Sequence, residues 1–255
     1  MQIRNSYYWF TNVISKKDCE RIIDMGKEEL ERIKKTGGNI EATTHGDNSK
    51  QDKPDGIPQG DATNEDIKKV IGEDKNVEES RYIRDSQVCW FNQSWLYDLI
   101  HPFIHTANRA AGWRYQWDFS ESFQFTKYTP GGFYGWHADG NSDHIGAYKR
   151  FIPGVSPTTP DGGIPTGYTT NPNMVGKIRK LSLTLNLNEP GEYEGGNLKF
   201  DFGPHSAGKR FHEVEEIRPQ GSMVIFPSYT YHQVTPVTKG TRYSLVLWSI
   251  GQPFR

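Results

Sequence analysis

The sequence predicts a mainly β protein, a two-sheet β-sandwich or jelly roll braced by α-helices at its N-terminal end. Short apolar and polar alternations recur through the second half of the chain, with Gly and Pro residues between them. Two stretches in the first half repeat apolar residues at helical spacing instead. At 255 residues, the chain is long enough to bury a sizeable core in a single domain.

The first half begins with a helix that follows the capping-box-like pattern Ser15-Lys-Lys-Asp18. We expect this helix to end near Gly37-Gly38. Residues from about 37 to 64 are rich in Gly, Asp, Asn, Lys and Pro, so they predict a surface insertion with little to bury. A strand over Ser80–Phe91 and a helix from Trp95 to about Gly112 follow.

Strands dominate the rest of the chain. Their predicted ranges are Ser120–Tyr128, Tyr134–Asp139, Lys180–Asn188, Asn197–Phe202, Glu213–Ile217, Ser222–Phe226, His232–Pro236 and Arg242–Ser249. In Lys180–Asn188 the leucines share one face and Ser182, Thr184 and Asn186 share the other. The leucine face is expected to pack on helices, and the polar face either lines a ligand cavity or is half solvated, as in an ordinary sandwich.

A candidate metal site lies at His137-Ala-Asp139, combined with His232 further along the chain. Two histidines and one aspartate can occupy one face of a metal ion and leave the other face open, as in non-haem Fe(II) oxygenases. Side chains two apart on an extended strand point the same way, so one strand can supply both His137 and Asp139.

The last predicted strand carries a candidate anion-binding arginine. Alternation places Arg242 on one face together with Ser244, Val246 and Trp248, and places Tyr243, Leu245 and Leu247 on the other. A guanidinium beside a metal site matches a carboxylate, because its planar donors meet both oxygens.

These motifs resemble those of the iron- and 2-oxoglutarate-dependent dioxygenases, and within them the prolyl 4-hydroxylase-like branch. The resemblance covers about the C-terminal half of the chain. The matching residues are Gln124–Asp139, Arg179–Asn188, Gly195-Gly196, Phe226-Pro-Ser228 and His232 through Trp248.

The resemblance implies a double-stranded β-helix, the jelly-roll or cupin-like fold, within a single domain of residues 1–255. Residues 1–115 would support a core of residues 116–255. The long connection of about residues 140–178 leaves the metal-binding strand directly, so we expect a lid-like loop, with an inert solvated loop as the alternative.

The resemblance also assigns ligands. His137, Asp139 and His232 would hold Fe(II), with 2-oxoglutarate as cosubstrate, dioxygen as oxidant and ascorbate as an optional reductant. Tyr128 matches the residue that hydrogen-bonds the cosubstrate, and Arg242 would meet its distal carboxylate. The expected reaction hydroxylates an aliphatic C–H bond and releases succinate and CO2.

The expected substrate is proline within a peptide or protein, converted to 4-hydroxyproline. Arg84 and Ser86 resemble the family's Arg-x-Ser strand that faces the substrate, although Arg84 fits an exposed ion pair equally well. Trp136 and Trp248 would wall a pyrrolidine ring, or simply belong to the core. Collagen-type members use lysine where Arg242 stands, which disfavours a collagen substrate.

Two alternatives stay open. The first keeps the chemistry but changes the substrate to a free amino acid, another peptide residue or a small metabolite. The second is a cupin-like binding protein, whose metal only organises a ligand pocket. Conversion of 2-oxoglutarate to succinate separates the enzymes from the binding protein.

Composition argues against several other classes. With 30 Lys and Arg against 31 Asp and Glu, the net charge of -1 gives no reason to expect nucleic-acid binding. No apolar run approaches the roughly 20 residues that cross a bilayer, and the N-terminus lacks the pattern of a signal peptide. Cys19 and Cys89 read as reduced core residues. We therefore expect a soluble cytoplasmic protein that does not bind membranes.

Overall fold

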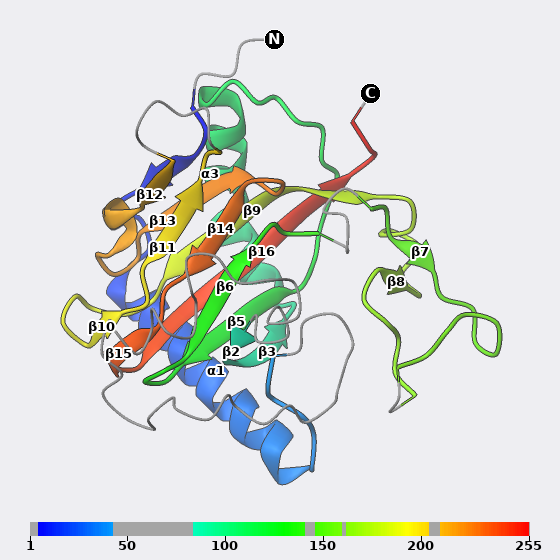
Figure 1. Ribbon diagram of the computed structural model, residues 1–255, viewed down its shortest axis with the longest axis horizontal. Helices are drawn as coiled ribbons and strands as arrows, with labels where there is room; N and C mark the ends of the chain where they lie inside the picture. Colours follow the sequence, from blue (N-terminus) through cyan, green and yellow to red (C-terminus); the bar gives the residue numbers. More distant parts are fainter. Residues whose placement is uncertain (1–4, 43–83, 141–145, 160–161, 204–209, 255) are drawn as a thin grey trace.

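The computed structural model describes residues 5–42, 84–140, 146–159, 162–203 and 210–254 (Figure 1). Most of the predicted 37–64 insertion and the first four residues of the predicted strand Ser80–Phe91 lie outside these ranges. The described residues form two antiparallel sheets of the double-stranded β-helix type, as expected. The predicted division near residues 115 and 116 stays a prediction.

The larger sheet has the strand order β1-β13-β9-β16-β5-β3, with β4 paired to β16. Its strands are β1 Tyr8–Phe10, β3 Gln87–Phe91, β4 Phe119–Ser120, β5 Phe123–Tyr128, β9 Ile178–Asn186, β13 Met223–Pro227 and β16 Arg242–Gly251. The smaller sheet has the order β12-β11-β14-β6-β2. Its strands are β2 Arg84–Asp85, β6 Phe133–His137, β11 Leu198–Asp201, β12 Phe211–Glu213 and β14 Tyr231–Val234. Two further pairs join β10 Tyr193–Gly195 to β15 Val237–Gly240, and β7 Lys149–Arg150 to β8 Tyr168–Thr169.

Two helices cover the outer face of the larger sheet, α1 at Lys16–Lys35 and α3 at Ser94–Ala110 (Figure 1). Helix α1 begins where the sequence predicts, because the Ser15 hydroxyl accepts a hydrogen bond from the Asp18 amide at 3.1 Å. Its buried face contains Gly26, whose missing side chain leaves room for the Phe125 ring: a Cβ there would lie 2.4 Å from that ring.

The alternation predicted for β9 is confirmed. Its leucines join the core that includes α1 and α3. A second apolar cluster contains residues of both sheets, among them Phe200 of β11, Phe226 of β13 and Val234 of β14. The polar face of β9 therefore points toward the smaller sheet, and Thr184 lines the cavity described below.

The predicted strand Glu213–Ile217 is wrong after its first residue. Strand β12 ends at Glu213, and Glu215–Ile217 form a 3-10 helix closed by the Arg218 amide, which donates to the Glu215 carbonyl at 3.0 Å. Val214 and Ile217 are both buried. Their spacing of three residues brings them to one side of a 3-10 turn, whereas a strand would place them on opposite faces.

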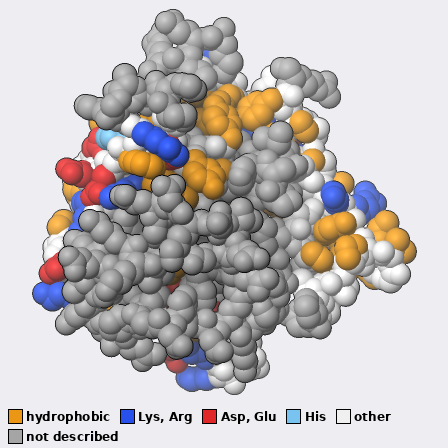
Figure 2. Space-filling model, viewed as in Figure 1, with side chains coloured by type: hydrophobic (Ala, Val, Ile, Leu, Met, Phe, Trp, Pro, Cys, Tyr) orange, Lys and Arg blue, Asp and Glu red, His pale blue; other side chains and the backbone are white. Residues whose placement is uncertain are grey.

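The connection between β6 and β9 leaves the body of the protein as a projecting segment, described over residues 146–159 and 162–177. Its strands β7 and β8 lie to one side of the sheets (Figure 1), and Figure 2 shows hydrophobic and basic side chains next to each other there. The predicted lid function of residues 140–178 stays a prediction. Within the part of the chain described, no helix is long and apolar enough to cross a membrane.

Candidate metal centre

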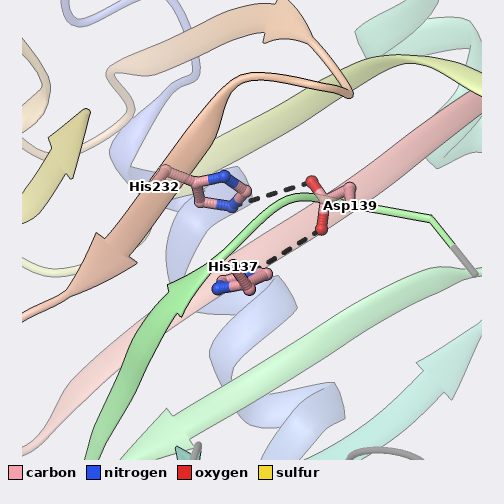
Figure 3. Close-up of side chains that lie close together, drawn as sticks. All are labelled: His137, Asp139 and His232. Atoms are coloured by element: carbon pink, nitrogen blue, oxygen red, sulfur yellow. Dashed lines mark ion pairs between the residues drawn. The ribbon is translucent and has the colours of Figure 1, made fainter. Parts of the chain in front are cut away.

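The three predicted metal ligands converge at one point between the sheets (Figure 3). His137 of β6 lies opposite His232 of the neighbouring strand β14. Asp139 follows just after β6 ends and places one carboxylate oxygen 3.8 Å from His137 Nε2 and the other 3.7 Å from His232 Nε2. All three ligand atoms lie within 4.8 Å of one another.

Backbone carbonyls fix the orientation of both imidazole rings. His137 Nδ1 lies 2.8 Å from the Gly135 carbonyl oxygen, and His232 Nδ1 lies 2.9 Å from that of Thr230. A carbonyl can only accept, so each Nδ1 carries a proton and each Nε2 is the ring nitrogen left to bind a metal beside Asp139. Two neutral imidazole Nε2 atoms and one carboxylate are the donor set of a facial Fe(II) site, so these residues fit that metal.

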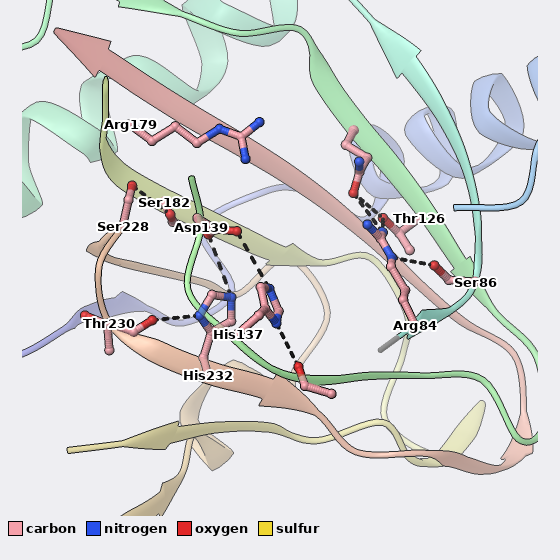
Figure 4. Close-up of polar contacts among 12 residues, drawn as sticks. Arg84, Ser86, Thr126, His137, Asp139, Arg179, Ser182, Ser228, Thr230 and His232 are labelled. Carbon is pink, nitrogen blue, oxygen red and sulfur yellow. Dashed lines mark hydrogen bonds and ion pairs between the residues drawn. The ribbon is translucent and has the colours of Figure 1, made fainter. Parts of the chain in front are cut away.

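Burial and mutual repulsion shape the protonation of the centre. Burial, and then the neighbouring His232, hold the pKa of His137 well below its usual value. Burial alone would raise the pKa of Asp139, but the nearby His232, His137, Arg179 and Ser182 lower it; Figure 4 shows these residues around the carboxylate. A neutral His137 beside an ionised Asp139 is the state that a divalent cation requires of its ligands.

A cavity that is partly open to solvent adjoins the three predicted metal ligands. The face predicted for β16 is confirmed, since all four of its members line this cavity. The lining residues are Arg84, Gln124, Tyr128, Tyr134, His137, Asp139, Thr184, Leu198, His232, Val234, Arg242, Ser244, Val246 and Trp248.

Arg242 places a buried positive charge on the wall of the cavity. It is only 2% exposed, and Nη1 donates to the Ser244 hydroxyl at 3.3 Å, while Nε has no hydrogen-bond partner among the described residues. No carboxylate of the described chain forms an ion pair with it. Tyr128 lies opposite it on β5, with the guanidinium 5.4 Å from its ring. A buried guanidinium without a counter-ion is strongly unfavourable, so this arrangement fits an anionic ligand such as a carboxylate.

Gly196 makes room for this arginine. A Cβ at Gly196 would lie 2.7 Å from Arg242 Cδ, and its φ of +60° lies in the left-handed region that disfavours other residues. Gly196 of the sequence motif is therefore explained by the path of the Arg242 side chain, whereas a Cβ at Gly195 would collide with the Pro236 carbonyl oxygen.

The predicted substrate residues take different positions. Arg84 lines the cavity, and its described partners are neutral: Nε donates to Ser86 at 2.8 Å and Nη2 to Gln124 at 2.8 Å (Figure 4). Ser86 is buried behind Arg84 and is absent from the lining. Trp248 lines the cavity, and within the described part of the chain its indole N–H has no hydrogen-bond partner.

The prediction that Trp136 walls the cavity needs correction. Strand alternation turns its side chain away from His137, and its ring lies 5.3 Å from Phe211 and stacks on Tyr231 at 6.2 Å, on the outer face of the smaller sheet. Phe211 and Tyr231 are exposed.

Tyr134 is a cavity residue that the sequence analysis missed. Its ring stacks on His137 with centroids 3.5 Å apart, and the Arg84 guanidinium lies 4.5 Å from it. Burial raises the pKa of its hydroxyl to about 12. Simple alternation would turn it away from His137, but the register between β6 and β14 shifts between these two positions. Such an irregularity leaves no periodic signal.

Comparison with known proteins identifies a matching family and several relatives. The model of the 2OG-Fe(II) oxygenase superfamily matches residues 123–250. A PKHD-type hydroxylase of Nitrobacter winogradskyi is 34% identical over 129 residues, which are 49% of this chain and 42% of that relative. One of Prochlorococcus marinus is 45% identical over 69 residues, 27% of this chain and 28% of the relative. The matched regions thus span less than half the length of these relatives.

Solved structures with low sequence identity share the fold. One is a viral collagen prolyl hydroxylase of Paramecium bursaria Chlorella virus-1 with 2OG, with a TM-score of 0.52 and 15% identity over 97% of each chain. Another is a prolyl hydroxylase of Trichoplax adhaerens in complex with a hypoxia inducible factor peptide fragment. Its TM-score is 0.53 and its identity 13%, over 96% of this chain and 83% of that one.

Proposed function

Since the chain belongs to the 2OG-Fe(II) oxygenase superfamily, we propose that it is an Fe(II)- and 2-oxoglutarate-dependent dioxygenase that hydroxylates proline within a peptide. The observation that carries the proposal is the pairing of two features in one cavity. Three potential ligand atoms face each other at one end, and on the same wall the buried guanidinium of Arg242 has no counter-ion among the described residues. A ligand that binds a metal at one end and carries a carboxylate at the other satisfies both.

In this proposal, His137, Asp139 and His232 hold Fe(II), which with 2-oxoglutarate and dioxygen supplies the oxidation of a C–H bond. Arg242 neutralises the distal carboxylate of the cosubstrate, and the Tyr128 hydroxyl donates a hydrogen bond to it. Both side chains are almost fully buried, so they hold the cosubstrate in one orientation and exclude water around it.

The peptide substrate would approach from the side of Arg84 and Trp248. Tyr134 and Trp248 offer aromatic surfaces, and Val234 and Val246 offer aliphatic ones, which together suit a pyrrolidine ring. The Arg84 guanidinium is fixed by Ser86 and Gln124, so it is oriented before any ligand binds. The names of the two prolyl hydroxylases with a similar fold motivate proline as the target residue.

The test is a substrate panel with the purified protein, Fe(II), ascorbate, oxygen and 2-oxoglutarate. The panel contains proline-bearing peptides, the same peptides with alanine for proline, and free proline. We expect a gain of one oxygen atom only on proline peptides, with one succinate formed per oxygen gained. Turnover of free proline or of a proline-free peptide, with none on proline peptides, would overturn the substrate and leave the dioxygenase chemistry standing. The Trp136→Ala variant is a matched control, because its ring lies outside the cavity, and it should keep its activity.

A further inference from the structure

A series of buried hydrogen bonds connects the projecting segment to the wall of the cavity. The Tyr148 hydroxyl donates to Glu121 Oε1 at 2.9 Å. The same carboxylate accepts two hydrogen bonds from Arg179, from Nε and Nη2, each at 2.6 Å. This Arg179 to Glu121 pair is bidentate and largely shielded from solvent, which is the geometry in which an ion pair fixes a side chain most firmly.

At the end of this series of hydrogen bonds, Arg179 contacts Trp248. The Arg179 guanidinium lies 3.9 Å from the centre of the Trp248 ring system, so a cation–π contact holds it against the indole. Trp248 lines the cavity, whereas Arg179, Glu121 and Tyr148 are not among the lining residues. These three residues therefore influence the cavity without lining it, through the indole and through the charge of Arg179 near Asp139.

Glu121 is held in place by its own backbone. Its amide donates to the Trp248 carbonyl at 3.0 Å, and its carbonyl accepts from the Tyr97 hydroxyl at 2.9 Å. The carboxylate thus stays close to the indole that Arg179 covers. Only the side-chain torsions of Glu121 are free to move, and Tyr148 and Arg179 restrain them.

Tyr148 lies where the projecting segment joins the body. Its amide donates to the Lys177 carbonyl at 2.9 Å, and its carbonyl accepts from the Gly176 amide at 2.8 Å. The two ends of the segment meet at this tyrosine. Its side chain, only 9% exposed, is the one that turns inward to Glu121. Any displacement of the segment would therefore act on the Glu121 carboxylate.

We propose that Tyr148 is a positioning residue, which holds Glu121 so that Arg179 keeps the Trp248 wall aligned while the projecting segment is docked. This role rests on the proposed function, because an aligned wall matters for placing the substrate C–H bond. Removal of the Tyr148 hydroxyl should impair alignment of the peptide and leave the metal and 2-oxoglutarate contacts intact.

The first measurement needs no activity. It is the fluorescence emission of Trp248, obtained by subtracting the emission spectrum of a protein that also carries Trp248→Phe from the spectrum of the same protein with Trp248 present. Tyr148→Phe should change this difference spectrum, and Tyr168→Phe should not. Tyr168 belongs to the same segment, its ring contacts Lys149 and, within the described chain, its hydroxyl makes no hydrogen bond. An unchanged Trp248 spectrum in folded Tyr148→Phe would overturn the proposal.

A double-mutant cycle separates positioning from general stabilisation. If Tyr148 acts through Glu121, adding Tyr148→Phe to Glu121→Gln should change the Trp248 spectrum little further, since coupled residues are not additive. Independent, additive changes would contradict the proposal even if both variants are folded.

The activity measurement compares two Michaelis constants. Tyr148→Phe should raise the KM for the proline peptide about tenfold and lower the fraction of succinate coupled to oxidised peptide, while the KM for 2-oxoglutarate changes less than about twofold. Equal losses for both substrates would point to a merely structural role and contradict the proposal. If the wild type forms no succinate at all, the proposed function fails, and the fluorescence cycle still decides the role of Tyr148.

Discussion

His137 and His232 lie opposite each other on neighbouring strands, with their ring centroids 4.1 Å apart. Each ring is fixed by a carbonyl two residues earlier in the chain, so the β6 and β14 pairing presents two Nε2 atoms in advance of any metal. Removing either ring should therefore damage metal binding far more than folding.

His232→Ala should reduce Fe(II) affinity by more than about 100-fold, because the remaining two ligands cannot hold the metal facially. Isothermal titration under anaerobic conditions measures this affinity, and thermal unfolding without metal measures folding. His212→Ala is the control, since its ring bonds Tyr7 outside the centre. Undiminished Fe(II) binding by His232→Ala would refute the assignment.

Arg242→Ala should weaken 2-oxoglutarate binding by about 30- to 1,000-fold, because one partner of a buried charge pair is lost. Arg242→Lys should restore only part of this loss, since an ammonium group cannot form the paired donors of a guanidinium. Titration of the Fe(II)-loaded protein without oxygen gives both affinities. Arg150→Ala, on the exposed β7, should bind as the wild type does. Equal affinity of wild type and Arg242→Ala for 2-oxoglutarate would refute the proposed role of Arg242.

Ser86→Ala should affect the peptide more than the cosubstrate. Ser86 accepts from Arg84 Nε and stands behind it, so the variant removes one restraint on the guanidinium, while its hydrogen bond to Gln124 remains. We expect a peptide KM about three- to tenfold higher with an unchanged 2-oxoglutarate KM, from the loss of one hydrogen bond to a charged group. Steady-state kinetics with each substrate varied in turn measures the two constants. A selective rise in the 2-oxoglutarate KM would show that Arg84 serves the cosubstrate instead.

Gly26→Ala tests the packing of α1 on the larger sheet. Alanine favours a helix over glycine by about 1 kcal/mol, but a Cβ 2.4 Å from the Phe125 ring overpacks the core. The clash should outweigh the propensity, and the free energy of unfolding should fall by about 1 to 2 kcal/mol. Chemical denaturation measures it. Glu28→Ala, exposed on the same helix, should stay within about 0.5 kcal/mol of the wild type. A more stable Gly26→Ala would contradict the packing.

Local periodicity predicted the features that depend on one element. The alternation in β16 places Arg242 and Trp248 on the cavity face, and the Ser15 cap starts α1 where expected. The periodicity of apolar residues failed to predict the structure where the backbone departs from regular strand geometry. The register shift in β6 brings Tyr134 beside His137, and the 3-10 turn at Glu215–Ile217 replaces a strand.

Features that join distant parts of the chain left no local signal. Glu121 and Arg179 are 58 positions apart, and neither residue alone differs from an ordinary surface charge in the sequence. Their pairing depends on β4 lying beside β16 and on β16 lying beside β9, which only the folded sheet establishes. Trp136 shows that closeness in the sequence can also mislead. It directly precedes His137 in the strand, and alternation therefore puts its side chain on the opposite face of the sheet.

The central claim is tested most directly by succinate formation from 2-oxoglutarate by the purified chain, measured with Fe(II) and oxygen present and with each omitted in turn. Wild type should form succinate only when both Fe(II) and oxygen are present. The Asp139→Asn variant keeps the shape of the ligand but removes its charge, so it should lose nearly all succinate formation. Succinate formed without Fe(II), or formed at the wild-type rate by Asp139→Asn, would contradict the account.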